Sequence, residues 1–480
     1  MTANTKNEKY GKMISAPFLP TTNPWAEPAM NQAHDRRTKR KHLFGARPID
    51  MKDLKILHLA RDEKFVDQGL RAFEQAAPGA NELYLYAPED LKYVKSPAKI
   101  ASRKELRTGS LSKEFVKYDL IIIHSLIPAW LKTLSKISKE TPLVWLGWGY
   151  DYYDLIHSSR NEMLLPLTQK AMRKQAIRSG VLTNLIRLAK RRLNTRKKKK
   201  LINQISFFAP VLANEYSIVK EKFADSTFPQ YISWNYGNLE RMLSNGLQDS
   251  RTNGAAILVG NSASAENNHI DVFSLLTTMG VSKRKIISPL SYGDDTYKDL
   301  VIKYGKSLLG DDFEPITEFM PLSQYMATLR ACGFVIMNHV RQQAVGNIVI
   351  MLYMGAKVFL RAECPTYAFL REQGAIVYTV QELEKNPRLL DETLDDISIL
   401  KNRKILEKNW SDDVGGQKTL NLLRLATDRN FTDRDSVPDY SSRVISKILA
   451  DSVSATRPEQ QSQRDMDLAL KRDMQRSHVD

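Results

Sequence analysis

The sequence predicts an α/β protein made of two doubly wound domains, in which helices cover both faces of a parallel sheet. Short apolar runs alternate with helical patterns, and the run at 118–124 (YDLIIIH) has the β-branched enrichment of a buried parallel strand. The chain has 480 residues, which is too long for one hydrophobic core. Asn, Ser and Gly are frequent at 237–254, and we place the domain boundary there.

The composition is that of a soluble protein, with 42% hydrophobic residues, 26% charged residues and a mean hydropathy of −0.39. The two cysteines, Cys332 and Cys364, argue against a disulfide framework and favour a reducing compartment. Residues 1–20 lack the apolar segment of a signal peptide. No apolar run approaches the roughly 20 residues that a membrane span needs. We therefore expect a cytoplasmic protein, and the net charge of +17 indicates an anionic partner.

The first domain is predicted at 51–245, after a basic, disordered tail at 1–50 that contains HDRRTKRKH (34–42). Its strands are predicted at 54–59, 82–86, 118–124, 142–147, 205–209 and 231–236, and its helices at 68–76, 128–138 and 215–223. This alternation places the carboxyl ends of its strands at one edge of a sheet, where ligands bind in such folds.

Polar clusters follow three of these strands: His58 with Asp62 and Lys64, His124 with Ser125, and the stretch 147–154 (GWGYDYYD). If the strands are parallel, all three clusters face one cleft. The rings of Trp148 and Tyr150 beside Asp151 suit a bound sugar on the acceptor side of that cleft. Alternatively, the aromatic residues pack at a domain interface and the aspartates cap the next helix.

A basic segment at 160–205 interrupts the first domain. Apolar residues recur there at helical spacing, and basic residues fill much of the rest, including RKKKK at 196–200. A basic amphipathic helix is typical of binding to an anionic membrane surface, where each Lys or Arg contributes on the order of 1 kcal/mol. Nucleic-acid binding would favour aromatic residues among the charges, and none occurs before Phe207. The alternative is a solvated helix whose apolar stripe lies in the core.

The second domain is predicted at 254–426, followed by a polar tail at 427–480. Its strands are predicted at 255–259, 285–289, 316–319, 334–337, 357–360 and 376–378, and its helices at 268–276, 297–306, 321–330, 347–354, 364–373 and within 381–426. The turn Gly260-Asn261-Ser262 and the loop 338–346 follow two of these strands. Arg341 and the free N–H groups of a helix beginning at Asn347 would hold a sugar-nucleotide diphosphate. The alternative is a loop that is merely solvated.

Collinear motifs over residues 54–425 resemble one family of glycosyltransferases. They are HLARDEKF (58–65), WLGWGYDYYD (145–154), ILVGNSASAENNHID (257–271), ISPLSYGDDTYKDLV (287–301) and the stretch 316–360, which contains NHVRQQAVGN. The chain resembles the TDP-N-acetylfucosamine:lipid II N-acetylfucosaminyltransferases, also called 4-alpha-L-fucosyltransferases, of glycosyltransferase family 56. The resemblance implies the GT-B architecture, in which two Rossmann-like domains face each other across a cleft. The basic helical insertion and both tails depart from the shorter members of the family.

The resemblance implies transfer of a deoxyamino sugar, similar to Fuc4NAc, from a dTDP-sugar to a polyprenyl-diphosphate-linked oligosaccharide. That step belongs to synthesis of enterobacterial common antigen, at the cytoplasmic face of the inner membrane. The basic segment at 170–200 would then bind the anionic membrane as a peripheral anchor, with no nucleic-acid partner. Donor-binding residues are predicted at Gly260, Asn261, Ser262, His269, Tyr292, His339, Arg341, Gln342, Gln343, Gly346 and Asn347.

Catalysis by such an enzyme depends on stabilising the negative charge that grows on the leaving diphosphate. For a general base toward the acceptor hydroxyl we predict Asp151 first and His124 second. The Asp-x-Asp matches, Asp433/Asp435 and Asp465/Asp467, lie in the polar C-terminal tail rather than after an apolar strand. We therefore expect neither a required metal nor another cofactor.

Two other functions fit the sequence. One is a glycosyltransferase of the same fold that acts on a different O-antigen or capsule acceptor. The other is a non-enzymatic protein that uses its basic surface to bind membrane or nucleic acid. The non-enzymatic protein would tolerate changes at Arg341 and the Gly260 turn, whereas the enzyme would not.

Overall fold

A computed structural model describes residues 53–428 except 88–89, 179–180, 224–227, 238 and 244–250. The predicted tails, 1–50 and 427–480, lie outside this range apart from Thr427 and Asp428, and so do both Asp-x-Asp matches. Within the described part of the chain, no helix combines the length and apolarity needed to cross a bilayer.

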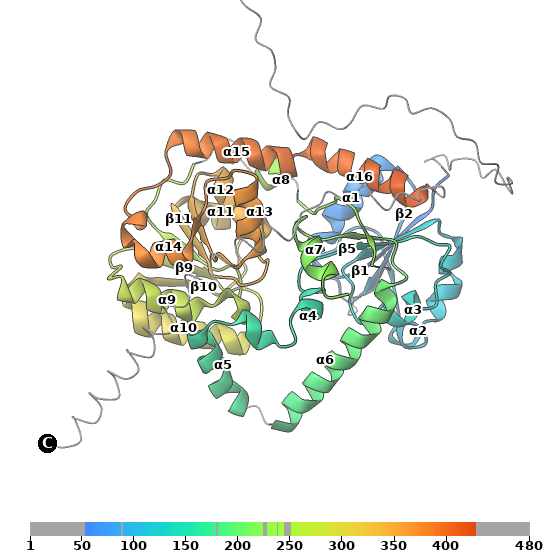
Figure 1. The fold of residues 1–480 in the computed structure, drawn as a ribbon, viewed down its shortest axis with the longest axis horizontal. Helices are drawn as coiled ribbons and strands as arrows, with labels where there is room; N and C mark the ends of the chain where they lie inside the picture. Colours follow the sequence, from blue (N-terminus) through green and yellow to red (C-terminus); the bar gives the residue numbers. More distant parts are fainter. Residues whose placement is uncertain are drawn as a thin grey trace, which may run out of the picture. The chain divides into compact units, whose positions relative to one another are not determined.

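The first sheet is built from β1 (Ile56–Arg61), β2 (Asn81–Tyr86), β3 (Lys99–Ile100), β4 (Leu120–His124), β5 (Leu143–Leu146), β6 (Phe207–Ala209) and β7 (Gln230–Tyr231). These seven strands are parallel and lie in the order β3-β2-β1-β4-β5-β6-β7. All five residues of β4 are buried, because helices cover both faces of the sheet at its centre. Figure 1 shows these helices around the sheet.

The second sheet is built from β8 (Ile257–Val259), β9 (Ile286–Pro289), β10 (Phe313–Ile316), β11 (Phe334–Met337), β12 (Lys357–Leu360) and β13 (Tyr378–Thr379). These six strands are also parallel, in the order β10-β9-β8-β11-β12-β13. In both sheets the chain order reverses beside the first strand, and ligands bind at such a switch point in doubly wound folds.

The helices before β8 are α1 (Val66–Ala76), α2 (Arg103–Thr108), α3 (Leu131–Leu134), α4 (Tyr153–Ile156), α5 (Pro166–Arg178), α6 (Val181–Ile202), α7 (Glu215–Lys220) and α8 (Leu239–Leu243). Those after it are α9 (His269–Thr278), α10 (Asp295–Leu309), α11 (Leu322–Arg330), α12 (Val345–Tyr353), α13 (Pro365–Glu372), α14 (Val380–Lys385), α15 (Asp396–Trp410) and α16 (Asp412–Thr427).

Several predicted elements differ from the structure in their bounds. The strand predicted at 316–319 lies at Phe313–Ile316, and it tolerates Pro315 because β10 is an edge strand. The helix predicted at 128–138 is reduced to the short α3. The strand predicted at 231–236 ends at Tyr231, after which Trp234 packs against Phe73 of α1, with 5.6 Å between ring centroids.

The last helix returns to the first sheet. Leu422 and Leu423 of α16 are fully buried in one cluster with Phe73 of α1 and Ile122 of β4. Figure 1 shows α16 beside α1. Residues up to 426 were predicted with the second domain, but α16 packs on the first.

The basic segment forms two helices rather than one, and both project away from the sheets (Figure 1). The N-terminus of α5 is capped from the second domain, because Asp271 of α9 accepts hydrogen bonds from the N–H groups of Leu167 and Thr168, each at 2.9 Å. In α6, Lys198 is buried and lies 3.0 Å from the carboxylate of Asp154. One lysine of the basic run is therefore structural.

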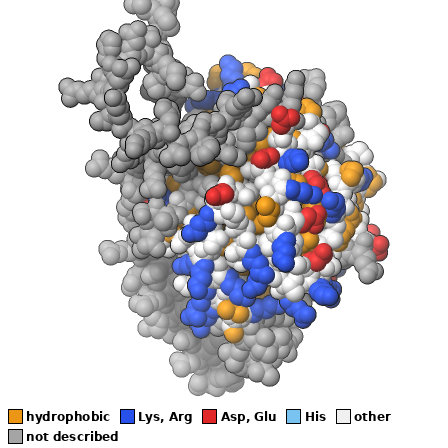
Figure 2. Space-filling view, turned by 90° about the vertical axis from the view of Figure 1, so that its right-hand side faces the viewer, with side chains coloured by type: hydrophobic (Ala, Val, Ile, Leu, Met, Phe, Trp, Pro, Cys, Tyr) orange, Lys and Arg blue, Asp and Glu red, His pale blue; other side chains and the backbone are white. Residues whose placement is uncertain are grey.

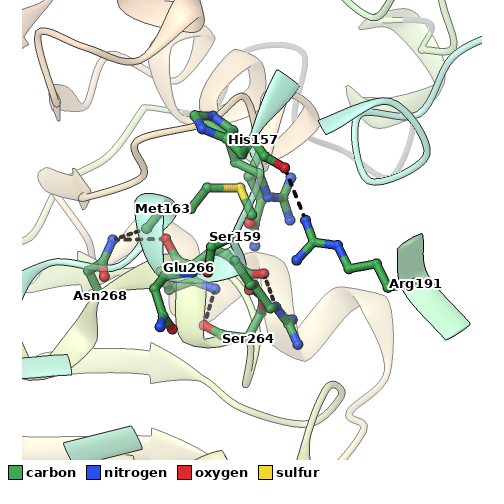
Figure 3. A network of polar contacts seen from close by, with 12 residues as sticks. His157, Ser159, Met163, Arg191, Ser264, Glu266 and Asn268 are labelled. Atoms are coloured by element: carbon green, nitrogen blue, oxygen red, sulfur yellow. Dashed lines mark hydrogen bonds and ion pairs between the residues drawn. The ribbon is translucent and has the colours of Figure 1, made fainter. Parts of the chain in front are cut away.

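A polar network joins the segment before α5 to the start of α9 (Figure 3). The Nε of Arg160 donates to the carboxylate of Glu266 at 2.5 Å, and Glu266 also accepts from Ser264. Asn268 donates to the carbonyl of Met163 at 3.3 Å. The insertion is thus held by side chains that belong to the second sheet's first helix and turn.

Candidate active site

A cavity of about 400 Å³ lies at the carboxyl ends of strands from both sheets. From the first domain it is lined by Phe65, Trp148, Tyr150, Pro210, Val211 and Tyr236, among others, and from the second by Asn261, Ser262, Ser264, Tyr292 and residues 341–347. Arg341 and the turn after Gly260 therefore share one pocket, as the sugar-nucleotide hypothesis requires. The volume is within the range of small-molecule sites.

The turn after β8 needs glycine at position 260. Gly260 has φ of +68°, and a Cβ there would lie 2.5 Å from Nε2 of His269. His269 is fully buried behind the turn, with its Nδ1 3.2 Å from the hydroxyl of Tyr297. His269 was predicted to bind the donor, but it supports the turn and does not line the cavity.

Asn267 fixes the shape of the same turn, and the sequence prediction missed it. Its Oδ1 accepts hydrogen bonds from the N–H of Asn261 at 2.9 Å and from Nε2 of His339 at 2.8 Å. Its Nδ2 donates to the carbonyls of Ser262 at 3.0 Å and Ser264 at 3.1 Å. Both His339 and Asn267 are fully buried, so His339 also acts behind the turn.

The opposite loop presents the N-terminus of α12 to the cavity. The helix begins at Val345, two residues earlier than predicted, so Gly346 and Asn347 lie in its first turn. Ala344 precedes it with φ of +59° and makes no side-chain cap. The first N–H groups of a helix have no acceptor within the helix, and they attract anions. These N–H groups and Arg341 form one wall of the cavity.

A buried carboxyl group in the first domain positions this loop. Glu215 accepts hydrogen bonds from the hydroxyls of Tyr152 and Tyr153, each at 2.8 Å, and from the N–H of Leu212 at 3.0 Å. The Tyr153 hydroxyl in turn accepts from the N–H of Gln342 at 2.9 Å. Burial raises the pKa of Glu215 to about 7.

We predict that Glu215→Gln changes the pH dependence of stability. Because the pKa of Glu215 is raised by folding, the unfolded chain loses this proton near pH 4.5 and the folded protein near pH 7. As the pH rises from about 4.5 to about 7, the free energy of unfolding of the wild-type protein therefore falls by up to about 3 kcal/mol. Glu215→Gln has no proton to lose there and should lack this fall. Urea unfolding of wild type and variant at pH 5 and pH 8 measures the difference; identical pH slopes would contradict this pKa.

Asp151 has the environment of a structural residue. Its Oδ2 accepts from the N–H of Leu126 and from Nε1 of Trp145, each at 2.7 Å, and its Oδ1 accepts from the N–H of Trp148 at 2.8 Å. Its side chain is buried and does not line the cavity. The prediction of Asp151 as base is not compatible with this conformation; Asp151 holds the turn that presents Trp148 and Tyr150.

Three further predicted residues lie away from the cavity surface. His124 and His58 are buried, with Nε2 of His124 2.9 Å from Nδ1 of His58. Burial lowers the pKa of His58 to about 4 and that of His124 well below its usual value, so both rings are neutral. Asp62 accepts from the N–H groups of residues 92–94 and fixes that loop. Among the described residues that line the cavity, none is Asp, Glu or His.

The cavity walls are chemically different from each other. Tyr292 and Gln343 join the polar wall, where Gln343 donates to the side-chain oxygen of Asn261 at 3.0 Å. Trp148 and Tyr150 line the first-domain side. In the part of the chain that the structure describes, no group of three carboxylate, histidine or cysteine side chains could hold a metal ion.

Two facing doubly wound sheets with a cavity at their carboxyl ends define a GT-B glycosyltransferase fold. Among solved structures of this fold, HepE of Anabaena, in complex with UDP and glucose, is 13% identical to this chain and has a TM-score of 0.52; the match covers 77% of this chain and 99% of HepE. The lipopolysaccharide outer core galactosyltransferase WaaB is 10% identical, with a TM-score of 0.51 over 77% of this chain and 99% of WaaB.

The family is indicated by the second half of the chain. Residues 235–410 match the family model described as 4-alpha-L-fucosyltransferase glycosyl transferase group 56. This match supports the family that the sequence motifs indicated. The chain is a glycosyltransferase that depends on a nucleotide sugar.

Proposed function

We propose that this enzyme transfers a deoxyamino sugar, similar to Fuc4NAc, from a dTDP-sugar to a polyprenyl-diphosphate-linked oligosaccharide. The reaction would serve synthesis of a bacterial surface polysaccharide similar to enterobacterial common antigen, at the cytoplasmic face of the inner membrane. The observation that carries the proposal is the convergence of Arg341, the first N–H groups of α12 and the Gly260 turn on one cavity.

The polar wall is suited to the diphosphate of the donor. A helix N-terminus offers fixed N–H donors and a positive dipole end, and a guanidinium adds a full charge in a bidentate geometry. These donors do not reorganise during the reaction, so they stabilise the charge that develops on the leaving diphosphate. The complexes of HepE with UDP and glucose and with UDP-glucose, on the same fold, support a nucleotide-sugar donor here.

The first-domain wall is suited to a sugar. Trp148 and Tyr150 present aromatic edges and faces, and their ring centroids lie 6.3 Å apart at an interplanar angle of 79°. Asp151 and the bond between the Ser125 and Tyr150 hydroxyls at 2.8 Å hold them in place. We assign this wall to the reacting sugars of donor and acceptor.

The surface charge supports an anionic, membrane-bound acceptor. Exposed basic residues of α6 include Arg192, Arg196, Lys197, Lys199 and Lys200. Others cover the first-domain face around α2 and α3, including Lys92, Arg103, Lys104, Arg107, Lys132 and Lys136. Figure 2 shows lysine and arginine side chains spread over this face. Such a surface would hold the enzyme against anionic lipid headgroups beside a lipid-linked substrate.

A thermal-shift panel of nucleotides tests the donor. We expect dTDP to raise the melting temperature more than UDP or GDP at equal concentration, because a ligand that binds only the folded state stabilises it by mass action. Equal shifts with all three would remove the dTDP assignment but keep the enzyme. No shift with any nucleotide would contradict the diphosphate site itself.

Vesicle binding tests the membrane surface. Arg192, Arg196 and Lys197, all exposed on α6, are replaced by glutamate, while buried Lys198 is kept. We expect co-sedimentation with phosphatidylglycerol vesicles to fall at least tenfold, since each lost contact is worth about 1 kcal/mol. The control replaces Lys401, Lys404 and Lys408 of α15 by glutamate. If both variants bind vesicles equally well, α6 is not the membrane-binding surface. That result would favour an enzyme that uses another acceptor.

A further inference from the structure

A chain of hydrogen bonds through the buried rings of His58 and His124 runs from the surface of the first domain to the cavity, and the proposed mechanism does not use it. It begins at the exposed carboxylate of Glu74 on α1 and passes through Asn81, His58 and His124. It ends at the hydroxyl of Tyr236, which contacts Nδ1 of His124 and lines the cavity. Tyr236 lies in the segment between the two sheets.

The direction of every bond in this chain follows from its first member. The Nδ2 of Asn81 lies 2.7 Å from the Glu74 carboxylate and 2.8 Å from the carbonyl of Ala77, and both of these groups only accept hydrogen bonds. The Oδ1 of Asn81 therefore faces Nε2 of His58, at 3.0 Å. Since this oxygen can only accept, Nε2 of His58 carries the proton.

The same reasoning fixes the next two bonds. Both histidines are neutral, so Nδ1 of His58 has a free lone pair and must accept from Nε2 of His124, 2.9 Å away. His124 is then protonated at Nε2 and accepts at Nδ1. The hydroxyl proton of Tyr236 is consequently donated to His124 and points away from the cavity.

Toward a ligand in the cavity that it lines, Tyr236 can therefore act only as a hydrogen-bond acceptor, because its proton is already donated to His124. Trp148 and Trp234 pack against it, with ring centroids 5.0 Å and 4.7 Å from that of Tyr236. The indole N–H of Trp148 also lies beside the Tyr236 oxygen, so a hydrogen-bond donor of the ligand competes with it for the lone pairs. Burial raises the pKa of Tyr236 well above its usual value, so the phenol stays neutral and is an acceptor without charge.

We propose that Tyr236 is a specificity-determining residue of the cavity, an oriented hydrogen-bond acceptor that selects a sugar hydroxyl or amide N–H. His124, His58 and Asn81 are positioning residues that fix its polarity. The inference rests on the proposed sugar transfer and names the residue that recognises the sugar. A site that holds a fixed acceptor discriminates against a ligand without the matching donor. The hydroxyl or amide N–H that Tyr236 recognises belongs either to the sugar of the donor or to the sugar of the acceptor.

Tyr236→Phe removes the oxygen and keeps the ring, and Tyr86→Phe, at an exposed position of β2, is the matched control. Calorimetric titration with dTDP and with dTDP-glucose compares the variants. If the donor sugar is read, dTDP-glucose binds Tyr236→Phe about 3- to 10-fold more weakly while dTDP binds equally. If the acceptor sugar is read, only the KM for a polyprenyl-diphosphate-linked oligosaccharide rises, by a similar factor. No change in either, or equal weakening of dTDP, would overturn the proposal.

Histidine ring tautomers test the polarity without any ligand. Long-range ¹H–¹⁵N spectra should show His58 and His124 as neutral Nε2–H tautomers at pH 7, assigned from the signals lost in His58→Gln and His124→Gln. A proton on Nδ1 of His124 would turn the Tyr236 hydroxyl toward the cavity and overturn the proposal. The spectra do not depend on nucleotide binding. They therefore test the polarity of Tyr236 even if the proposed sugar transfer is wrong.

Discussion

Replacing Arg341 by alanine should weaken dTDP binding by about 10- to 100-fold. It should also lower the rate of sugar transfer. The guanidinium lies in the same cavity wall as the N-terminus of α12, and hydrogen bonds to a charged group are worth about 1.5–3 kcal/mol. Loss of this charge also removes stabilisation of the leaving diphosphate in the transition state. Titration calorimetry with dTDP and a transfer assay measure the two effects.

Two companion variants make the Arg341 experiment specific. Arg341→Lys keeps the charge but loses the planar fork, so we expect an intermediate affinity. Arg388→Ala, at an exposed position of the same domain, should bind dTDP as wild type does. Melting temperatures without ligand show whether the fold is retained. Unchanged dTDP affinity in a folded Arg341→Ala protein would mean that the diphosphate binds elsewhere.

Asn267→Asp should both destabilise the protein and abolish dTDP binding. The new carboxylate can still accept from Asn261 and His339, but its second oxygen would face the carbonyls of Ser262 and Ser264, which need a donor. A buried charge against acceptors should cost about 3–5 kcal/mol, which lowers the melting temperature by roughly 5–15 °C. Differential scanning calorimetry checks this.

The matched control for Asn267→Asp is Asn386→Asp. Asn386 is exposed after α14, so the same chemical change there should alter stability by less than about 0.5 kcal/mol. If both variants melt at the wild-type temperature, Asn267 does not organise the turn. If Asn267→Asp is destabilised but binds dTDP normally, the Gly260 turn is not part of the donor site.

The sheets could be predicted because their strands are local, continuous apolar runs. The bounds of β11 and β12 match the prediction at both ends, since glycines and polar residues flank each run. The start of α12 was misplaced because Ala344, a non-glycine with positive φ and no capping side chain, carries none of the usual signals. The short α3 shows that an apolar pattern does not by itself set the length of a helix.

The roles of polar residues depended on contacts far apart in the chain. A carboxylate that follows a strand gives the same sequence pattern whether it is a catalytic base or a structural residue. The structural role of Asp151 becomes apparent only from its hydrogen bonds with the N–H of Leu126 and the indole of Trp145. Glu215 reaches the donor loop through Tyr153, which is 189 residues before Gln342. No local pattern marks such a pair.

The most direct measurement is a crystal structure of the protein with dTDP. The diphosphate should lie within hydrogen-bond distance of the first N–H groups of α12 and of the Arg341 guanidinium, with Asn261 and Ser262 on the other side. A diphosphate bound instead among Lys170, Arg173 and Lys174 on α5, where a separate surface hollow lies, would contradict this site.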